Sequence, residues 1–270
     1  MTPDTDYNQD MAYRAWLGLL IATVSLRAQA ADPMAVLPAI REYALSYTAK
    51  LPNYTATQTI KRDTKPTPQG RYTIGRAQTE TVEEQISYVE GRELHKILRV
   101  NGQTVKETEQ DSGGMYSRGE FALLLSVIFR TETKTAFHFD KLAKLNGRQM
   151  VVFAFSVPQL PNGYGIREGE RTLIVPYKGT VFADAETHAV MRIQMNCTDI
   201  PPVSQYRGVG ITLDYKPTMV AGQEFILPSG YTMNLRRLDS DVTMQAAYKN
   251  YQRFGADATI IFEEEPNAAQ

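Results

Sequence analysis

The sequence predicts a mainly β protein of the α+β class. One strongly curved antiparallel sheet, or half-open β-barrel, would carry an N-terminal helix and an internal helical lid. Apolar and polar residues alternate through most of the chain. Turn signals such as Asn101-Gly102 and Asn146-Gly147 separate the alternating segments. Helical spacing is found instead in residues 38–51 and 119–129.

Residues 1–30 predict a secretory signal peptide. An apolar or small stretch, residues 15–26, follows Arg14 and ends before Ala28-Gln29-Ala30, an A-x-A cleavage site. This stretch is too short to span a bilayer, which takes about 20 residues. We therefore expect cleavage after Ala30, a periplasmic or secreted product, and no transmembrane span in the mature chain.

The start of this leader leaves two candidate initiators. Three aspartates lie before Met11, which is the wrong charge for the first part of a signal peptide, whereas a start at Met11 gives Met-Ala-Tyr-Arg. Both Met1 and Met11 are therefore kept as initiators. The rest of the chain, residues 31–270, has no linker long enough to divide it and is expected to form a single domain.

Charge and cysteine content limit the partners. Residues 1–30 contain two basic and three acidic residues, so of the 29 basic and 30 acidic residues in the chain 27 of each remain. A neutral surface argues against nucleic acid as a partner. Cys197 is the single cysteine, which excludes an intramolecular disulfide and a C-x-x-C motif. Its position on the apolar face of a strand predicts an inert, buried thiol.

The first helix should pack on the sheet, because Ile40, Ala44, Tyr47 and Leu51 share one of its faces. From Asn53 onward the period becomes two. In residues 82–88, four residues share one face and oppose Glu83, Gln85 and Ser87: Val82, Glu84, Ile86 and Tyr88.

The second helix, residues 119–129, is apolar. Its spacing places Phe121, Leu124, Leu125 and Ile128 together, and Ser117 is a candidate N-cap. Strands are expected on both sides of it, with a final strand at residues 260–262. Since two helices cannot cover about ten strands, the sheet must curl on itself.

Two later strands have the clearest alternation. In residues 150–157 one face carries Val151, Phe153, Phe155 and Val157. In residues 190–197 the predicted apolar face carries Met191, Ile193, Met195 and Cys197. The same pattern recurs near residues 211–215, 231–235 and 242–248. One face of the sheet should meet water while the other covers something.

The order of these parts resembles the lipoprotein-carrier fold shared by the periplasmic chaperone LolA, the outer-membrane receptor LolB and the sigma-factor regulator RseB. Residues 54–60 are similar to the first strand of that fold. Residues 181–193 are similar to its hairpin, in which an Asp and a Thr flank the turn and an Arg follows, here Asp184, Thr187 and Arg192. The whole chain also resembles uncharacterised secreted proteins of environmental bacteria.

The resemblance implies a concave apolar face that holds a lipid, a lipoprotein acyl chain or another apolar ligand. The helix over residues 119–129 is the candidate lid. The expected ligand-binding residues lie on this helix and on the two clearest strands: Leu124, Ile128, Phe153, Phe155, Met191, Ile193 and Met195. The alternative is an envelope regulatory or scaffold protein of the same fold that binds a protein partner through a sheet edge or helix.

Catalytic and metal motifs are not found in the sequence. His95, His138 and His188 are scattered and lack metal-ligand spacing, so no metal or cofactor is expected. A G-x-S-x-G nucleophile turn is missing. Glu83 and Glu84 should face opposite sides of one strand, which excludes joint catalysis. We therefore expect a binding protein and not an enzyme; a hydrolase would instead show a polar cleft with a perturbed titratable group.

Overall fold

The computed structural model describes residues 32–68, 75–90, 92–106, 120–161 and 164–253. The elements below belong to one unit of the chain, which begins at Pro33. The predicted signal peptide, the candidate cap Ser117 and the predicted strand at residues 260–262 lie outside the described residues.

Eleven strands form a single antiparallel sheet in the order β4-β3-β2-β1-β13-β12-β11-β10-β9-β6-β5. The strands are β1 (Tyr54–Pro66), β2 (Gln78–Val89), β3 (Arg92–Val100), β4 (Gln103–Thr104), β5 (Ala136–Leu145), β6 (Arg148–Val157), β9 (Tyr177–Asp184), β10 (Val190–Cys197), β11 (Tyr206–Val220), β12 (Gln223–Arg237) and β13 (Ser240–Arg253). β7 (Gly165–Glu168) and β8 (Arg171–Ile174) form a separate two-stranded sheet.

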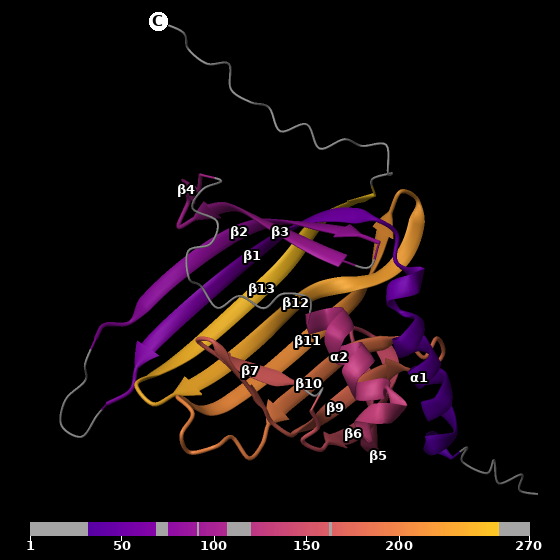
Figure 1. The fold of residues 1–270 in the computed structure, drawn as a ribbon. Coiled ribbons are helices and arrows are strands. Elements are labelled where there is room, and N and C mark those ends of the chain that lie inside the picture. Colours follow the sequence, from indigo (N-terminus) through magenta and orange to yellow (C-terminus); the bar gives the residue numbers. More distant parts are fainter. Residues whose placement is uncertain (1–31, 69–74, 91, 107–119, 162–163, 254–270) are drawn as a thin grey trace, which may run out of the picture. The chain divides into compact units, whose positions relative to one another are not determined.

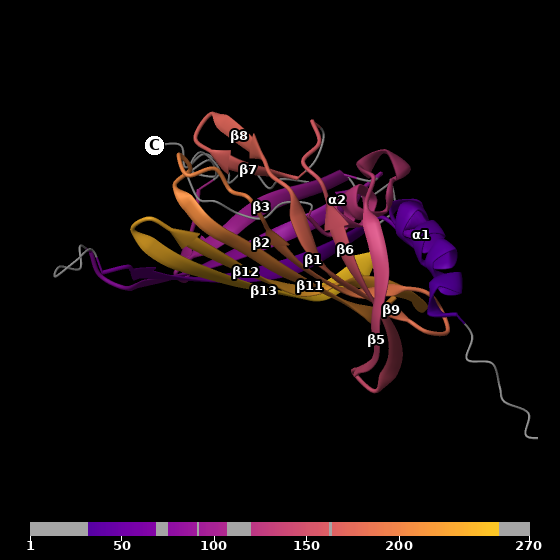
Figure 2. The same ribbon diagram turned by 90° about the horizontal axis from the view of Figure 1, so that it is seen from below.

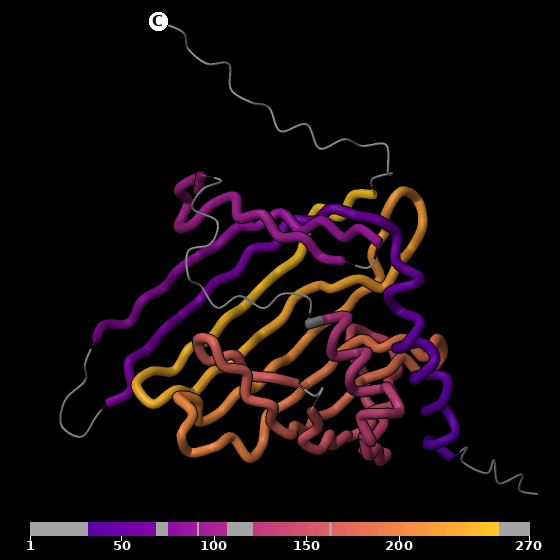
Figure 3. The backbone as a smooth tube through the Cα atoms, viewed as in Figure 1, coloured from indigo at the N-terminus to yellow at the C-terminus, as the bar shows by residue number. Residues whose placement is uncertain are grey.

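The large sheet is curved and open. Its edge strands, β4 and β5, do not pair with each other, so the sheet is not closed into a barrel. β1 pairs with β13, which brings the first and last described strands side by side in the sheet (Figure 3). α2 (Glu120–Phe129) lies over the concave side of the sheet, and α1 (Leu37–Ser46) lies at one end of the strands (Figures 1 and 2). The predicted fold class is confirmed.

The helix predicted at residues 38–51 is divided into an α-helix and a 3-10 turn. α1 follows a 3-10 turn at Pro33–Val36 and is continued by a second 3-10 turn at Thr48–Lys50. Ile40, Ala44 and Tyr47 are buried in the main core, as the spacing predicted. The Tyr47 hydroxyl donates to the carbonyl of Ile226 in β12 at 3.0 Å. This contact fixes the helical segment to the end of the longest hairpin.

Turn chemistry explains the tight hairpins. Asn101-Gly102, after β3, and Asn146-Gly147, between β5 and β6, have φ between 50° and 81° at both residues. These positive φ values belong to a two-residue turn whose twist matches the flanking strands, and Asn and Gly adopt them most readily.

The β9–β10 turn depends on Asp184. Its Oδ1 accepts hydrogen bonds from the backbone N–H groups of Glu186 and Thr187 at 3.1 and 2.8 Å and from the Thr187 hydroxyl at 3.0 Å. Its Oδ2 accepts from Arg148 at 2.6 Å. Burial opposes ionisation, but these hydrogen bonds lower the pKa of Asp184 to about 2. Asp184 and Thr187 are therefore turn formers, as predicted.

Gly179 shows how closely β9 and β10 approach each other. A Cβ built at this residue would lie 1.8 Å from the backbone carbonyl oxygen of Gln194 in β10. No side chain fits there, and such glycine positions are a recognised way to introduce curvature into a sheet.

Candidate functional site

The concave apolar face of the sheet, together with α2, is the candidate site. Six of the seven predicted ligand-binding residues lie in one buried cluster here and are at most 2% exposed. They are Leu124 and Ile128 of α2, Phe153 and Phe155 of β6, and Ile193 and Met195 of β10. The alternation in β6 and β10 and the 3.6-residue spacing in α2 bring them together.

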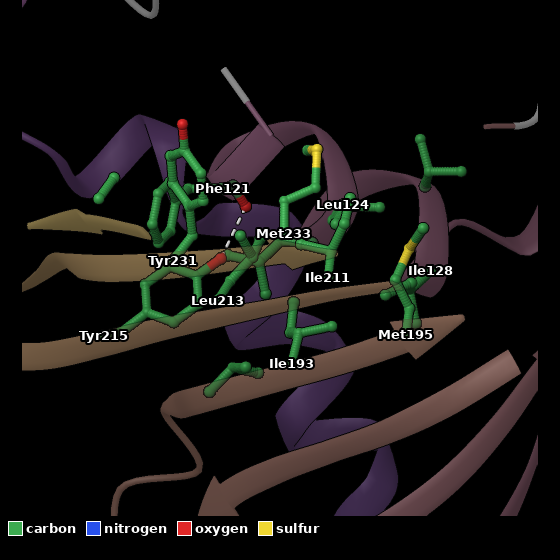
Figure 4. Packing of buried hydrophobic residues seen from close by; sticks show 14 of the residues in the cluster. Phe121, Leu124, Ile128, Ile193, Met195, Ile211, Leu213, Tyr215, Tyr231 and Met233 are labelled. Carbon is green, nitrogen blue, oxygen red and sulfur yellow. Dashed lines mark hydrogen bonds between the residues drawn. The ribbon is translucent and has the colours of Figure 1, made fainter. Parts of the chain in front are cut away.

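In this structure α2 occupies the face. Leu124 and Ile128 lie next to Ile211 and Met195 of the sheet, with Ile193 nearby (Figure 4). Eight of the ten residues of α2 are apolar. All the described side chains on its sheet-facing side are buried, while Leu123, on the opposite side, is 46% exposed. α2 is therefore an apolar helix that packs on the concave face.

The first turn of α2 is held by aromatic side chains. The Phe121 ring meets Tyr215 of β11 and Tyr248 of β13 edge to face, with ring centroids 5.2 and 5.4 Å apart. The Tyr215 hydroxyl donates to the Phe121 carbonyl at 2.8 Å. Among the described residues this is the side-chain hydrogen bond that joins α2 to the sheet, so apolar contact supplies most of the attachment.

The facing predicted for Met191 is wrong. Met191 packs with Met150, Val152 and Ala189 in a second, smaller buried cluster. The pairing of β10 with β9 shifts register between Val190 and Arg192, so the extra residue reverses the alternation at that point. Since Val151 and Phe153 belong to the main cluster, Met150 and Val152 face the other side of β6.

A group of polar residues interrupts the apolar face on strands β1, β2, β3 and β13. Gln58 of β1 lies directly opposite Glu84 of β2 and Tyr248 of β13 in the sheet register. Gln58 and Glu84 are both 0% exposed. Gln58 donates through Nε2 to the Tyr248 hydroxyl at 2.7 Å. We call Tyr248, Gln58, Glu84 and His95 the polar row.

His95 of β3 completes this row. Its Nδ1 lies 2.9 Å from Oε2 of Glu84, and its Nε2 lies 3.6 Å from Oε2 of Glu93. The His95 side chain is 3% exposed. Burial lowers the pKa of His95, but the hydrogen bond to Glu84 and the charges of Glu84 and Glu93 outweigh burial and raise the pKa to about 9. His95 is therefore protonated at neutral pH and donates to Glu84.

Sequence reasoning placed Glu84 correctly on the inward face, opposite Glu83, but did not combine it with His95. Glu83 instead pairs with Arg99 at 2.8 Å on the outer side. The sequence signal for this site is that each of two neighbouring strands has a polar residue at a position that should face the core. Gln58 lies between Ala56 and Ile60, as Glu84 lies between Val82 and Ile86.

Cys197 packs against the main cluster, as predicted, but its side chain is partly buried and not fully buried. Burial raises the pKa of its thiol to about 12. The thiolate, which is the reactive form, is therefore scarce at neutral pH.

A pocket of about 430 Å³ opens at the C-terminal end of α2. Its walls come from the end of α2, the following turn and the segment after β6: Val127, Arg130, Glu132, Thr133, Leu160 and Pro161. This volume is within the range of small-ligand sites. It lies beside the candidate face, because Val127 belongs to the same buried cluster.

Within the described ranges, no group of three or more His, Cys, Asp or Glu residues is placed to hold a metal ion. His138, in β5, and His188, in the β9–β10 turn, do not join His95 in any described contact. A search of the helices in the same ranges finds none long and apolar enough to cross a bilayer.

No protein-family model matches the chain. No curated protein matches it either. Several solved structures, however, are similar to this chain. The chain is similar to a LolA superfamily protein from Nitrosomonas europaea, at 9% identity and a TM-score of 0.42, over 81% of this chain and 94% of that one.

A second similar structure is a domain of an outer membrane lipoprotein-sorting protein from Vibrio parahaemolyticus, at 13% identity and a TM-score of 0.44, over 85% of this chain and 96% of that one. A third is a DUF1329 family protein from Desulfovibrio piger, at 9% identity and a TM-score of 0.42, over 83% and 95%. Identities this low, with TM-scores below 0.5, assign neither a family nor a role to this chain.

Proposed function

We propose that this chain is a non-enzymatic envelope protein, periplasmic or secreted, that shelters an apolar ligand on the concave face of its sheet. The ligand is a lipid or the acyl chain of a lipoprotein. The observation that carries the proposal is α2, an apolar helix that packs on the concave face and is joined to the sheet mainly by apolar contact. Such contact is non-directional, so an acyl chain can replace the helix on the same side chains.

α2 is thus proposed to be the lid, and Leu124 and Ile128 the side chains that a ligand displaces. The ligand would then contact Phe153, Phe155, Ile193 and Met195, which are buried beneath α2. The pocket at the end of α2 is the proposed entrance, because it adjoins this face at Val127. Met191 has no part in this site, since it belongs to the second cluster.

The polar row supports a binding role over catalysis. It contains a histidine with a raised pKa, but Glu84 and His95 are fully or almost fully buried. The hydroxyl group within the row is that of Tyr248, which bonds to Gln58, and no serine, threonine or cysteine of the described residues bonds to His95. A nucleophile and a base within reach of each other are required for acyl transfer.

The proposal is tested by native mass spectrometry of the protein produced in a bacterial periplasm, followed by organic extraction of whatever accompanies it. We expect a phospholipid or an acylated peptide bound to the folded protein. Its release on replacing Ile193 or Phe153 by a smaller apolar residue would place it on this face. A mass without any adduct, together with failure to bind added long-chain probes, would overturn the proposal.

A protein partner is the second candidate, favoured by the edge of the sheet. β5 is a ten-residue edge strand, and its Leu142 is 67% exposed. An open edge of this length can pair with a strand of another chain. Capture of an envelope protein that is lost when a proline replaces a residue in the middle of β5 would favour this function.

A further inference from the structure

We infer that the polar row is a subsite for a primary ammonium group at the polar end of the ligand. The inference rests on the proposed function, because it assigns a head group to the chain that the apolar face would hold. The proposed ligand is therefore an amphiphile that has a long apolar chain and a cationic head group with N–H donors.

The position of the row is the first argument. Tyr248, Gln58 and Glu84 lie on adjacent strands at directly opposed positions, and His95 reaches Glu84 from β3. The inward residues on both sides of Gln58, Ala56 and Ile60, belong to the main apolar cluster. The polar row is thus surrounded by the apolar face, and it can contact the head group of an amphiphile whose chain lies on that face.

Unpaired acceptors are the second argument. Oε1 of Glu84 and Oε1 of Gln58 are buried and have no hydrogen-bond partner. The two residues are cross-strand neighbours, and both are 0% exposed. Buried acceptors without donors are costly and rare in native proteins. A ligand that brings N–H groups to this point would supply the missing donors.

Charge is the third argument. The imidazolium of His95 faces two carboxylates, those of Glu84 and Glu93, so one negative charge is left over. Within the described part of the chain, neither carboxylate pairs with an arginine or a lysine. Tyr54, Tyr88 and Tyr251 also lie near Glu93, and its charge adds to burial in raising their pKa values.

An ammonium group supplies both the missing hydrogen-bond donors and the missing positive charge. It carries three N–H donors and one positive charge, and its hydrogen bonds to a carboxylate are of the strong, charge-assisted kind. A carboxylate or phosphate head could accept from Nε2 of His95, which is also buried without a hydrogen-bond partner, but it would leave the two unpaired acceptors without donors and add a negative charge. A quaternary ammonium has the charge but no N–H group.

Four probes with the same dodecyl chain test the inference: dodecylamine, dodecyltrimethylammonium, dodecanol and dodecanoate. Each is titrated below its micelle concentration at neutral pH against a fluorescent acyl probe bound to the full mature chain. We expect dodecylamine to bind at least about tenfold more tightly than dodecanol and the quaternary amine, the ratio that one charge-assisted hydrogen bond supplies. Dodecanoate should bind most weakly.

The matched variants are Glu84→Gln and Glu83→Gln, which remove neighbouring carboxylates from opposite faces of β2. Glu84→Gln should abolish the preference for dodecylamine over dodecanol, while Glu83→Gln should retain both the preference and the dodecanol affinity of the unaltered protein. If Glu84→Gln does not fold, the probe series on the unaltered protein decides.

The outcomes separate the two proposals. Equal binding of all four probes, or a preference that Glu84→Gln leaves intact, overturns the ammonium subsite while the proposed function stands. Failure of every probe to bind overturns the proposed function and the subsite with it.

Discussion

The Tyr215 hydroxyl donates a 2.8 Å hydrogen bond to the Phe121 carbonyl, and the two rings meet edge to face with centroids 5.2 Å apart. The first residue lies in β11 and the second at the start of α2. One tyrosine thus supplies both a directional and an apolar contact between the sheet and the proposed lid. Any exchange of α2 for a ligand has to break this hydrogen bond.

Tyr215→Phe is therefore expected to make the lid easier to displace. The ring contact with Phe121 is kept, but loss of the hydrogen bond should lower the free energy of unfolding by about 1 kcal/mol. If α2 must leave before an acyl chain binds, the apparent Kd for an uncharged long-chain probe should fall by up to about fivefold. Urea unfolding and probe titration measure the two effects.

Tyr251→Phe is the control for this variant. It removes a similar hydrogen bond, from the Tyr251 hydroxyl to the Pro228 carbonyl at 2.6 Å, which does not involve α2. It should destabilise the fold by a comparable amount and leave probe affinity unchanged. Equal effects of both variants on affinity would show that Tyr215 does not hold a lid.

A charge at Ile193 should unfold the protein. Ile193 is 0% exposed in β10, whereas the next residue, Gln194, faces the other side and accepts a hydrogen bond from Thr180 at 3.2 Å. Ile193→Asp should cost several kcal/mol, about 3 or more, because a carboxylate is buried without a partner. Gln194→Asp should cost about 1 kcal/mol or less. Thermal melts compare them, and equal losses would contradict this facing.

The sequence predicted these faces because side chains alternate strictly in a regular strand. Met191 shows the limit of that rule. One extra residue in β10 moves Met191 to the second cluster, while Ile193 and Met195 keep the predicted side. Bulges depend on the register between two strands, which the residues of a single strand do not specify.

The polar row could be predicted only in part, for a related reason. Alternation places Gln58 and Glu84 on the inward face, but their contact depends on the register of β1 against β2. His95 lies opposite Ile86 in the pairing of β2 with β3, so it reaches Glu84 as a diagonal cross-strand neighbour. The pairing of strands therefore creates the polar row, and no local sequence motif predicts it.

Cys197 should be unreactive until the protein unfolds. Burial raises the pKa of its thiol to about 12, so a thiol reagent at neutral pH should modify the native protein slowly and the denatured protein fast. This makes Leu123→Cys a selective probe of the lid, since Leu123 is 46% exposed on α2. A label there should change its fluorescence when an acyl probe binds. Rapid native labelling of Cys197 would contradict the burial described for it.

Stability should decrease as the pH rises from about 6.5 to about 9, because of His95. Folding raises the pKa of His95 from 6.5 to about 9, since the hydrogen bond to Glu84 and the charges of Glu84 and Glu93 outweigh the effect of burial. The folded state therefore binds the proton more tightly than the unfolded state does. The resulting stabilisation is complete below about pH 6.5 and is lost as the pH passes through about 9, by roughly 1–3 kcal/mol.

Urea unfolding at about pH 6 and about pH 9 measures this loss. His95→Gln should flatten the pH dependence, because glutamine does not titrate. His138→Gln, which alters an exposed histidine of β5, should leave the dependence unchanged. The same slope in all three proteins would mean that the His95–Glu84 pair does not set the stability in this pH range. A slope lost only in His95→Gln would show that the protonated imidazole is held in place by the carboxylates of the polar row and its neighbour Glu93.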